Sequence, residues 1–491
     1  MIKGASPLPG RVYDRPGLTK NSFFPVLGAE DMNPEGWVSL LPVTVLLVAV
    51  IVTRRALESL LIAIAVGFML KDGLSFFPSM LDTVYSVMQD PTIGFVILLC
   101  SVMGAFVAVL DHSGGTKGFG DWVSSRVSTR RGVLLGTWLM SLFIFIDDFL
   151  ISLTLGICMT PSADRYKVPR EMTAYVVNSS AAPVASLVPI SAWAVFIAAL
   201  LEKYLALPAG EGLALFVRTI PFNFYAWFAF FMVPLVVTGI VPVIGPMRQA
   251  EERVRRTGEL APPGSELISM RKPHDMSEEG PKAMARNLVL PVLVLIAGTM
   301  WFGVNLFKGG VIALSFCCAF YRIQGIMPVA RFTETCLRGI GNMLFPMVFT
   351  CLAFTFNYVN QELGLIPFII GKATPLLSPA LFPLVIFVIL GFVAFLVGIS
   401  WSLYLIAFPL VIPLAQALGA DLVLAVAATV AAGTLGQHCC FYSDGTILVS
   451  ASTGCDNIRH ALTQLPFAMI AAGLACVGFL VAGFLSTQGF H

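Results

Sequence analysis

Two adjacent carboxylates, Asp147 and Asp148, interrupt an apolar stretch, and the nearest basic residues are 16 and 17 positions away. An ionisable side chain inside a membrane span costs at least about 2.5–3.5 kcal/mol, which makes it a functional candidate by default. Adjacent side chains on a helix point about 100° apart, so only one of the two readily faces a given cavity. The pair predicts a cation or proton site in which the other Asp holds the local geometry. A solvated pair at a helix end or hairpin tip is the alternative.

A second polar segment runs from Asn178 through Ser179 and Ser180 to Pro183, and Pro189 and Ser191 follow shortly after. Small hydroxyl and amide side chains next to proline are typical of unwound segments that bind hard cations through oxygen atoms. We therefore expect an unwound, ion-binding segment within residues 178–193. Close packing of small residues between helices would explain the same composition.

A third polar segment covers 436–446, after a shorter one at 398–401 that contains Ser400. His438 next to Cys439 and Cys440 invites a metal interpretation. Structural zinc sites, however, use four ligands with two or more residues between paired cysteines, which disfavours that interpretation. We expect oxygen ligands at a helix break instead, from the side chains of Ser443, Asp444 and Thr446, with Gln437 and His438 beside them.

Two further polar groups are interpreted as structural. Asp456 and His460 are expected in a short interfacial loop. Asp111 and His112 end an apolar run and are expected at the surface.

The elements around these segments must be membrane spans. The chain has 491 residues, of which 57% are hydrophobic and 12% charged, whereas soluble domains carry about 25% charged residues. Each crossing needs about 20 apolar residues, and four stretches provide that length with no charged residue, at 92–110, 287–307, 379–397 and 463–486. Such runs predict about 11–13 segments. The run at 172–201 is either one tilted span or two short ones.

Other features exclude several classes of protein. The sequence contains no basic cluster with interleaved aromatic residues, the pattern that would indicate nucleic-acid binding. It also contains no G-x-x-x-x-G-K-[ST] motif, the pattern that would indicate ATP binding. The ten cysteines lie within or beside hydrophobic segments, which predicts no disulfide framework. Residues 1–35 contain five prolines and no apolar core, so we expect a cytoplasmic tail rather than a signal peptide.

One polar loop divides the hydrophobic chain into two similar parts. Residues 248–286 contain eight Lys or Arg, which predicts a cytoplasmic location. We expect four regions: the tail at 1–35, a first membrane half at 36–247, the central loop at 248–286 and a second membrane half at 287–491. Two such halves are typical of internally duplicated transporters.

The first half also contains a stretch with basic residues on both flanks. Arg126, Arg130 and Arg131 precede residues 132–161, and Arg165 follows them, so both ends are expected in the cytoplasm. The stretch is then expected to enter the membrane and return to the same side, as a re-entrant hairpin or as two short spans. Frequent Pro and Gly elsewhere predict broken helices, which at membrane depth must line a cavity or be buried in protein.

These segments together resemble the NhaC family of Na+/H+ antiporters, over roughly residues 36–486. The first-half segments that carry the resemblance are Asp147-Asp148, Met159-Thr160-Pro161, Arg170-Glu171, Ala181-Ala182-Pro183 and Pro189-Ile190-Ser191 with Trp193. In the second half they are Gly436, His438-Cys439, Ser443-Asp444, Thr446-Ile447-Leu448, Cys455-Asp456, His460 and Thr463-Gln464-Leu465-Pro466. The resemblance implies broken helices or hairpins whose tips meet near the bilayer midplane.

The chain departs from the family pattern where charge matters most. Asn178 and Gln437 stand where the family typically has Asp, and an amide does not titrate. Asp147, Asp148 and Asp444 remain, so a coupling ion still has carboxylates to bind. The change weakens the case for strict Na+/H+ antiport and leaves room for an organic substrate.

The sequence therefore predicts an all-α polytopic membrane protein of two related halves with broken helices or re-entrant hairpins. Its expected function is cation/proton antiport by alternating access. Ion-coupled transport of a small organic acid or amino acid is the alternative, and a membrane-embedded enzyme using His438 and Cys439 is a third, disfavoured one. One wall of the expected site carries Asp147, Asp148, Asn178, Ser179, Ser180 and Ser191, and the other carries Ser400, Gln437, His438, Ser443, Asp444 and Thr446.

The expected coupling ions are Na+ and H+, with Na+ at Asp147, Asp148 and Asp444 and no other cofactor. Expected partners are membrane lipid and a small ion or molecule, without nucleic acid, and a homodimer is left open. The expected location is the cell membrane, which is the inner membrane if the organism is Gram-negative.

Overall fold

The computed structural model describes residues 36–53, 56–208, 210–263, 265, 284–302, 305–375, 377–397, 400–441 and 443–487. Over these ranges the regular structure is helical throughout. The predicted tail at 1–35 and residues 266–283 of the predicted central loop lie outside the described residues.

The described helices are long and apolar enough for a multi-pass membrane protein. Seven of them could cross a membrane by length and composition, or eight if one bent pair counts as a single span. Four shorter apolar helices of 10–17 residues lie among the described residues as well. Several crossings are therefore built from short or broken helices rather than from single long ones.

The helices of the first half run in the order α1 (Leu41–Thr53), α2 (Ala56–Asp72), α3 (Phe76–Met88), α4 (Pro91–His112), α5 (Gly115–Ser124), α6 (Arg130–Ser141), α7 (Asp148–Arg165), α8 (Arg170–Leu187), α9 (Ala192–Leu205), α10 (Glu211–Thr219), α11 (Phe224–Thr238) and α12 (Gly245–Thr257). Those of the second half are α13 (Arg286–Trp301), α14 (Leu306–Ile323), α15 (Val329–Asn342), α16 (Leu344–Glu362), α17 (Leu365–Ala373), α18 (Phe382–Val397), α19 (Ser400–Leu418), α20 (Leu422–Cys439), α21 (Asp444–Thr453) and α22 (Asn457–Thr487). Short 3-10 turns cover Gly36–Leu40, Gly73–Ser75 and Ile220–Phe222.

The two halves repeat the same order of elements. The pair α6 and α7 forms a helical hairpin, and α18 and α19 occupy the same place in the second half. A helix broken inside the fold follows each hairpin, namely α8 and α9 in the first half and α20 and α21 in the second. The helices α10 and α12 have no counterpart in this order. Recurrence of this kind is the architecture of duplicated transporters.

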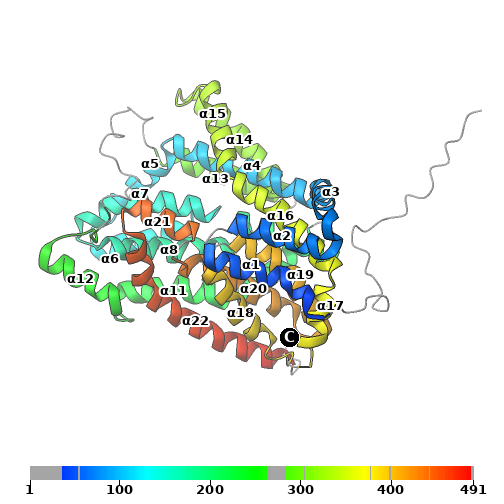
Figure 1. Cartoon of the computed structure of the whole chain (residues 1–491). Helices are drawn as coiled ribbons and strands as arrows, with labels where there is room; N and C mark the ends of the chain where they lie inside the picture. Colours follow the sequence, from blue (N-terminus) through cyan, green and yellow to red (C-terminus); the bar gives the residue numbers. More distant parts are fainter. Residues whose placement is uncertain are drawn as a thin grey trace, which may run out of the picture.

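Figure 1 shows that the halves interleave rather than sitting side by side as separate bodies. The blue helices α1 and α2 lie beside the yellow and orange helices of the second half, and α8 contacts α20, α21 and α22. The first-half hairpin contacts the second-half broken helix through α7 and α21. Residues far apart in the sequence therefore share one interior.

Two local expectations need correction. The unwound segment expected within residues 178–193 is limited to 188–191, because α8 continues through Asn178 and Pro183 to Leu187 and α9 begins at Ala192. The helix tolerates this proline inside it because its surroundings can satisfy the freed backbone group. His460 is not in an interfacial loop, because it lies in the first turns of α22 and is completely buried.

Candidate functional site

Asp147 and Asp148 lie where the first-half hairpin turns into α7. Asp147 caps the helix, and its Oδ1 accepts a hydrogen bond of 2.9 Å from the backbone N of Phe149. Asp148 is the first residue of α7, and both side chains are buried, at 3% and 2% exposure. The pair is thus at a helix end, as in the alternative interpretation, but it is not solvated. The positive end of the helix dipole at this position stabilises negative charge.

The break between α8 and α9 lies against this hairpin tip. Ser191 caps α9 by accepting a hydrogen bond of 3.1 Å from the backbone N of Ala194, and its hydroxyl donates to Ala185 O at 2.6 Å. The backbone N of Ala192 donates to Ile146 O at 2.9 Å, which joins the break to the residue before Asp147. Unpaired backbone groups are costly away from water, so these bonds explain why the chain can leave the helix here.

The break between α20 and α21 repeats this design in the second half. Ser443 caps α21, and its Oγ accepts a hydrogen bond of 3.1 Å from the backbone N of Thr446. Asp444 is the first residue of α21, and its Oδ1 accepts from the backbone N of Gly445 at 2.8 Å. Both halves therefore place a carboxylate at the start of a helix that begins inside the fold.

A single amide connects the carboxylates of the two halves. The Nε2 atom of Gln437 donates to Asp148 Oδ2 at 3.3 Å and to Asp444 Oδ1 at 2.5 Å. The other oxygen of Asp148 accepts a hydrogen bond of 3.0 Å from Trp193 Nε1. Both oxygens of Asp148 thus have neutral donors, so Asp148 is held in place without a counter-ion.

His438 lies in a second polar cluster directly behind this bridge. Its Nε2 contacts Ser179 Oγ at 2.8 Å and its Nδ1 contacts Tyr225 OH at 2.7 Å. Asn178 donates to Gln464 Oε1 at 3.1 Å, and Gln464 in turn donates to the backbone O of His438. The cluster joins α8, α11, α20 and α22, and its polar atoms satisfy one another.

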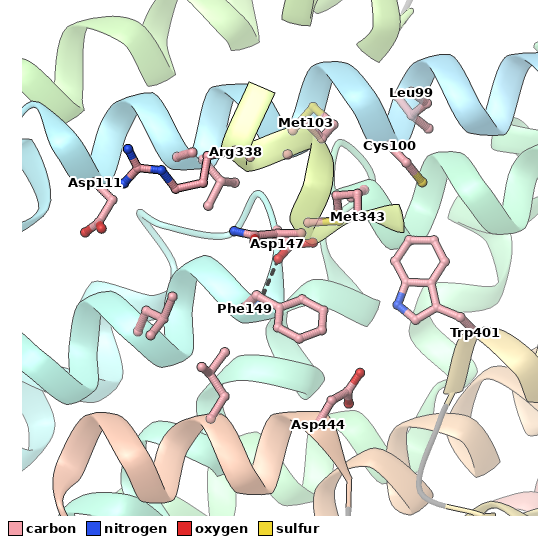
Figure 2. Close-up of a pocket in the computed structure, with 18 of the residues that line it drawn as sticks. Leu99, Cys100, Met103, Asp111, Asp147, Phe149, Arg338, Met343, Trp401 and Asp444 are labelled. Carbon is pink, nitrogen blue, oxygen red and sulfur yellow. Dashed lines mark hydrogen bonds between the residues drawn. The ribbon is translucent and has the colours of Figure 1, made fainter. Parts of the chain in front are cut away.

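A cavity of about 530 Å³ lies in front of the bridge. Figure 2 shows Asp147 and Asp444 on its wall, with Trp401 on one side and Asp111 and Arg338 on the other. Most of the remaining lining is apolar and comes from α4 and α15, where Gly104 and Gly339 face each other so closely that a Cβ on either would meet the other's backbone. The cavity therefore lies between α4 and α15 on one side and the hairpin and broken helices on the other.

The structure separates the predicted site residues into three groups. Asp147 and Asp444 line the cavity, whereas Asp148 and Gln437 stand behind them in the bridge. Ser191 and Ser443 are helix caps, and Thr446 accepts a hydrogen bond from the hydroxyl of Ser443. The third group is buried behind the bridge and consists of Asn178, Ser179, Ser180 and His438.

Two parts of the predicted second-half wall are not described. Ser400 begins α19, but its side chain is outside the described part, as are residues 398–399 before it.

The three carboxylates do not form one cage around a metal ion. No group of three or more His, Cys, Asp or Glu side chains within the described residues is close enough to hold one. A bound Na+ would have to use Asp147 and Asp444 together with hydroxyl, amide or backbone oxygens, which are the ligands that hard cations accept.

Sequence reasoning missed the residues that α4 and α15 contribute to the cavity. Asp111 and His112 end an apolar run, which predicts only a surface position, and Arg338 belongs to an amphipathic helix with further charges at 331 and 334. Trp193 and Gln464 stand out in the sequence only as parts of family motifs, although each donates a hydrogen bond inside the site. Only the folding of α15 across α4 reveals the contribution of these helices.

A duplicated membrane fold with broken helices, two inward-facing carboxylates and a central cavity defines a secondary transporter. The comparisons with known proteins agree. The chain belongs to the Na+/H+ antiporter family, whose sequence profile it matches over residues 209–484.

A relative from Haemophilus influenzae, described as an uncharacterized protein, is 28% identical in an alignment of 494 positions that covers 92% of each chain. The YdaH transporter of Alcanivorax borkumensis has a similar fold, with a TM-score of 0.52, 13% identity and coverage of 85% of this chain and 90% of its own. Neisseria gonorrhoeae MtrF, of a class of antimetabolite efflux pumps, matches with a TM-score of 0.50, 15% identity and coverage of 90% and 96%. At these identities the two structures show a common fold.

Proposed function

We propose that this transporter exchanges Na+ for H+ across the cell membrane by alternating access. The observation that supports it best is the position of Asp147 and Asp444 on the wall of one cavity, each at the beginning of a helix that starts inside the fold. A carboxylate binds either a proton or a cation, so the two ions compete for the same group. This competition is the physical basis of exchange.

The bridge behind the cavity supports a division of roles among the polar groups. Asp148 already accepts hydrogen bonds on both oxygens, and Gln437 cannot titrate. Asp147 and Asp444 line the cavity beside the bridge, whereas the third lining carboxylate, Asp111, lies at the end of α4. In this proposal the two carboxylates beside the bridge bind the coupling ion, and Asp148 and Gln437 hold them in position.

Proteoliposomes test the proposal directly. Wild-type protein should dissipate an imposed pH gradient when Na+ is added, as followed with a pH-sensitive dye, whereas K+ serves as the comparison cation. Asp444→Asn should reduce this flux to the background. Asp421→Asn is the matched control, because Asp421 caps α20 away from the cavity and asparagine caps a helix equally well. Equal Na+-dependent flux in wild type and Asp444→Asn would refute the proposed site.

The size of the cavity favours a second candidate, the ion-coupled transport of a small organic acid or amino acid. A volume of about 530 Å³ is in the range of small-molecule pockets, which are about 300–1,000 Å³. Its walls are mostly apolar, and Arg338 offers a guanidinium group to a carboxylate. Uptake of labelled amino acids and dicarboxylates, driven by a Na+ or H+ gradient in the same proteoliposomes, distinguishes this candidate from cation exchange.

A further inference from the structure

A buried ion pair connects α9 with the turn that precedes α4. Lys203 in the last turn of α9 is bonded to Asp90, and the two side chains are only 7% and 10% exposed. The ammonium group also lies over the ring of Phe354 in α16, 4.0 Å from its centroid. The pair therefore joins a broken helix of the site region to two helices on the other side of the cavity.

The cavity reaches exposed residues at Asp111 and Arg338, and we call this end its mouth. The ion pair lies at the opposite end of α4. The cavity is lined by α4 from Leu99 to His112, whereas Asp90 immediately precedes the helix, which has 22 residues. At 1.5 Å per residue this places the ion pair about 30 Å from His112, close to the thickness of a bilayer core.

The position of Lys203 along α9 also places the ion pair away from the cavity. Ala192 at the beginning of α9 lines the cavity, and Lys203 is three turns further on. The buried ion pair therefore lies beyond the end of the cavity that is opposite the exposed residues Asp111 and Arg338.

The residue after Lys203 strengthens the same contact. Tyr204 stacks on Phe354, with ring centroids 6.4 Å apart, and its hydroxyl accepts a hydrogen bond of 3.3 Å from Asn357 Nδ2. Asn357 also donates to Leu405 O at 2.6 Å, which binds α19 to the same place. All of these contacts join α9 or α19 to α4 or α16, so motion of one set against the other must break them.

We propose that Lys203 and Asp90 form the gate that closes the transporter on the side opposite the cavity mouth. Separating two buried opposite charges away from water is unfavourable, so the pair separates only when both charges become hydrated. This penalty holds the far side shut while the site is open toward the mouth. The inference rests on alternating access as part of the proposed function, but not on the identity of the transported solute.

A cysteine at the cavity floor reports which side is open. Ala192→Cys, in a chain whose native cysteines are replaced, is labelled with a membrane-impermeant maleimide in right-side-out and inside-out vesicles. The variant to test is Asp90→Asn with Lys203→Met, because neutralising both partners avoids a lone buried charge. We expect the labelling rate of this variant from the far side to be about fivefold or more above that of the wild type. Its labelling rate from the mouth side should be lower than that of the wild type. The reversed pair, Asp90→Lys with Lys203→Asp, should return both rates toward the wild type.

Lys308→Met is the matched control, since Lys308 also lies over an aromatic ring but at the exposed start of α14. Tyr204→Phe removes one hydrogen bond without changing charge, and it should raise far-side labelling by a smaller factor. Far-side labelling of the neutral pair equal to that of Lys308→Met, in protein that melts at the wild-type temperature, would overturn the gate. The labelling experiment needs no transported solute, so it can be repeated in an Asp444→Asn background that lacks Na+/H+ exchange. If the neutral pair still raises far-side labelling there, the gate holds independently of the proposed Na+/H+ exchange.

Discussion

Asp147 and Asp444 line one cavity although they belong to opposite halves of the chain. Each lies at the beginning of a helix that starts inside the fold, and Asp148 and Gln437 connect the two positions from behind. The two halves therefore supply one site, and a change in either half is expected to affect the same ion.

The two adjacent carboxylates should respond differently to substitution. Asp147→Asn removes a cavity-lining charge and should abolish coupled flux while the protein stays folded. Asp148→Asn keeps the shape of the side chain but turns an acceptor of the Gln437 amide into a donor, which should lower stability by about 1–3 kcal/mol. Flux and thermal unfolding measured on both purified variants check this. Undiminished coupled flux in the double variant would falsify the role of this pair.

Gln437→Leu should destabilise the site without removing any charge. It leaves Asp148 Oδ2 and one contact of Asp444 without the amide donor, and each unsatisfied buried acceptor costs about 1–3 kcal/mol. We expect a lower unfolding temperature and weaker apparent Na+ affinity. Gln416→Leu makes the same replacement at an exposed position of α19 and should change neither quantity. If the two variants behave alike, the bridge has no energetic role.

A second ion pair anchors the segment after α11. Arg253 in α12 donates to both oxygens of Glu171 at 2.7 and 2.9 Å, and the carboxylate side chain is 1% exposed. These hydrogen bonds raise the pKa of Arg253 above its ordinary value. Arg253→Met leaves Glu171 buried without its partner and should cost about 3–5 kcal/mol in the free energy of unfolding.

Arg248→Met is the control for this pair. Arg248 and Glu252 are 72% and 40% exposed, and surface pairs contribute only about 0–1 kcal/mol. Thermal or denaturant unfolding in detergent compares the two variants. Similar losses of stability in the two variants would mean that the burial of Glu171 does not determine how much its ion pair with Arg253 contributes to the free energy of unfolding.

The orientation of the chain is tested at the end of α12. Positive charge predicts that this segment is cytoplasmic. A cysteine at Ser265 would be a poor reporter, because Ser265 is only 4% exposed and accepts a hydrogen bond of 3.0 Å from the backbone N of Asp456. Arg256→Cys is exposed instead, and it should react with an impermeant thiol reagent in inside-out vesicles but not in intact cells. Rapid labelling in intact cells would reverse the orientation.

The membrane class of the fold was predictable because each crossing needs a run of apolar residues that is visible in the sequence. The hairpin was predictable as well, since basic residues at Arg131 and Arg165 flank one apolar stretch. Helix breaks were harder to locate. Pro183 suggested a break that occurs only after Leu187, because neighbouring helices bury and satisfy the backbone around it.

The charges of the site could be recognised in the sequence because a carboxylate among apolar residues needs an explanation wherever it folds. Asp147, Asp148 and Asp444 stand out for this reason. Their separate roles depend on contacts between segments far apart in the chain, such as Trp193 with Asp148 and Gln437 with Asp444. No local pattern encodes such a pairing.

The sequence by itself thus determined that this protein has several membrane-spanning segments and that a few carboxylates lie among apolar residues, and it suggested two halves on either side of one polar loop. Only the tertiary structure decided which carboxylates meet the cavity, that α4 and α15 form its other wall, and that Lys203 pairs with Asp90 beyond it. The physical reason is that hydrophobicity and charge are properties of single residues and short segments. A cavity or a gate exists only between segments, once packing has brought them together.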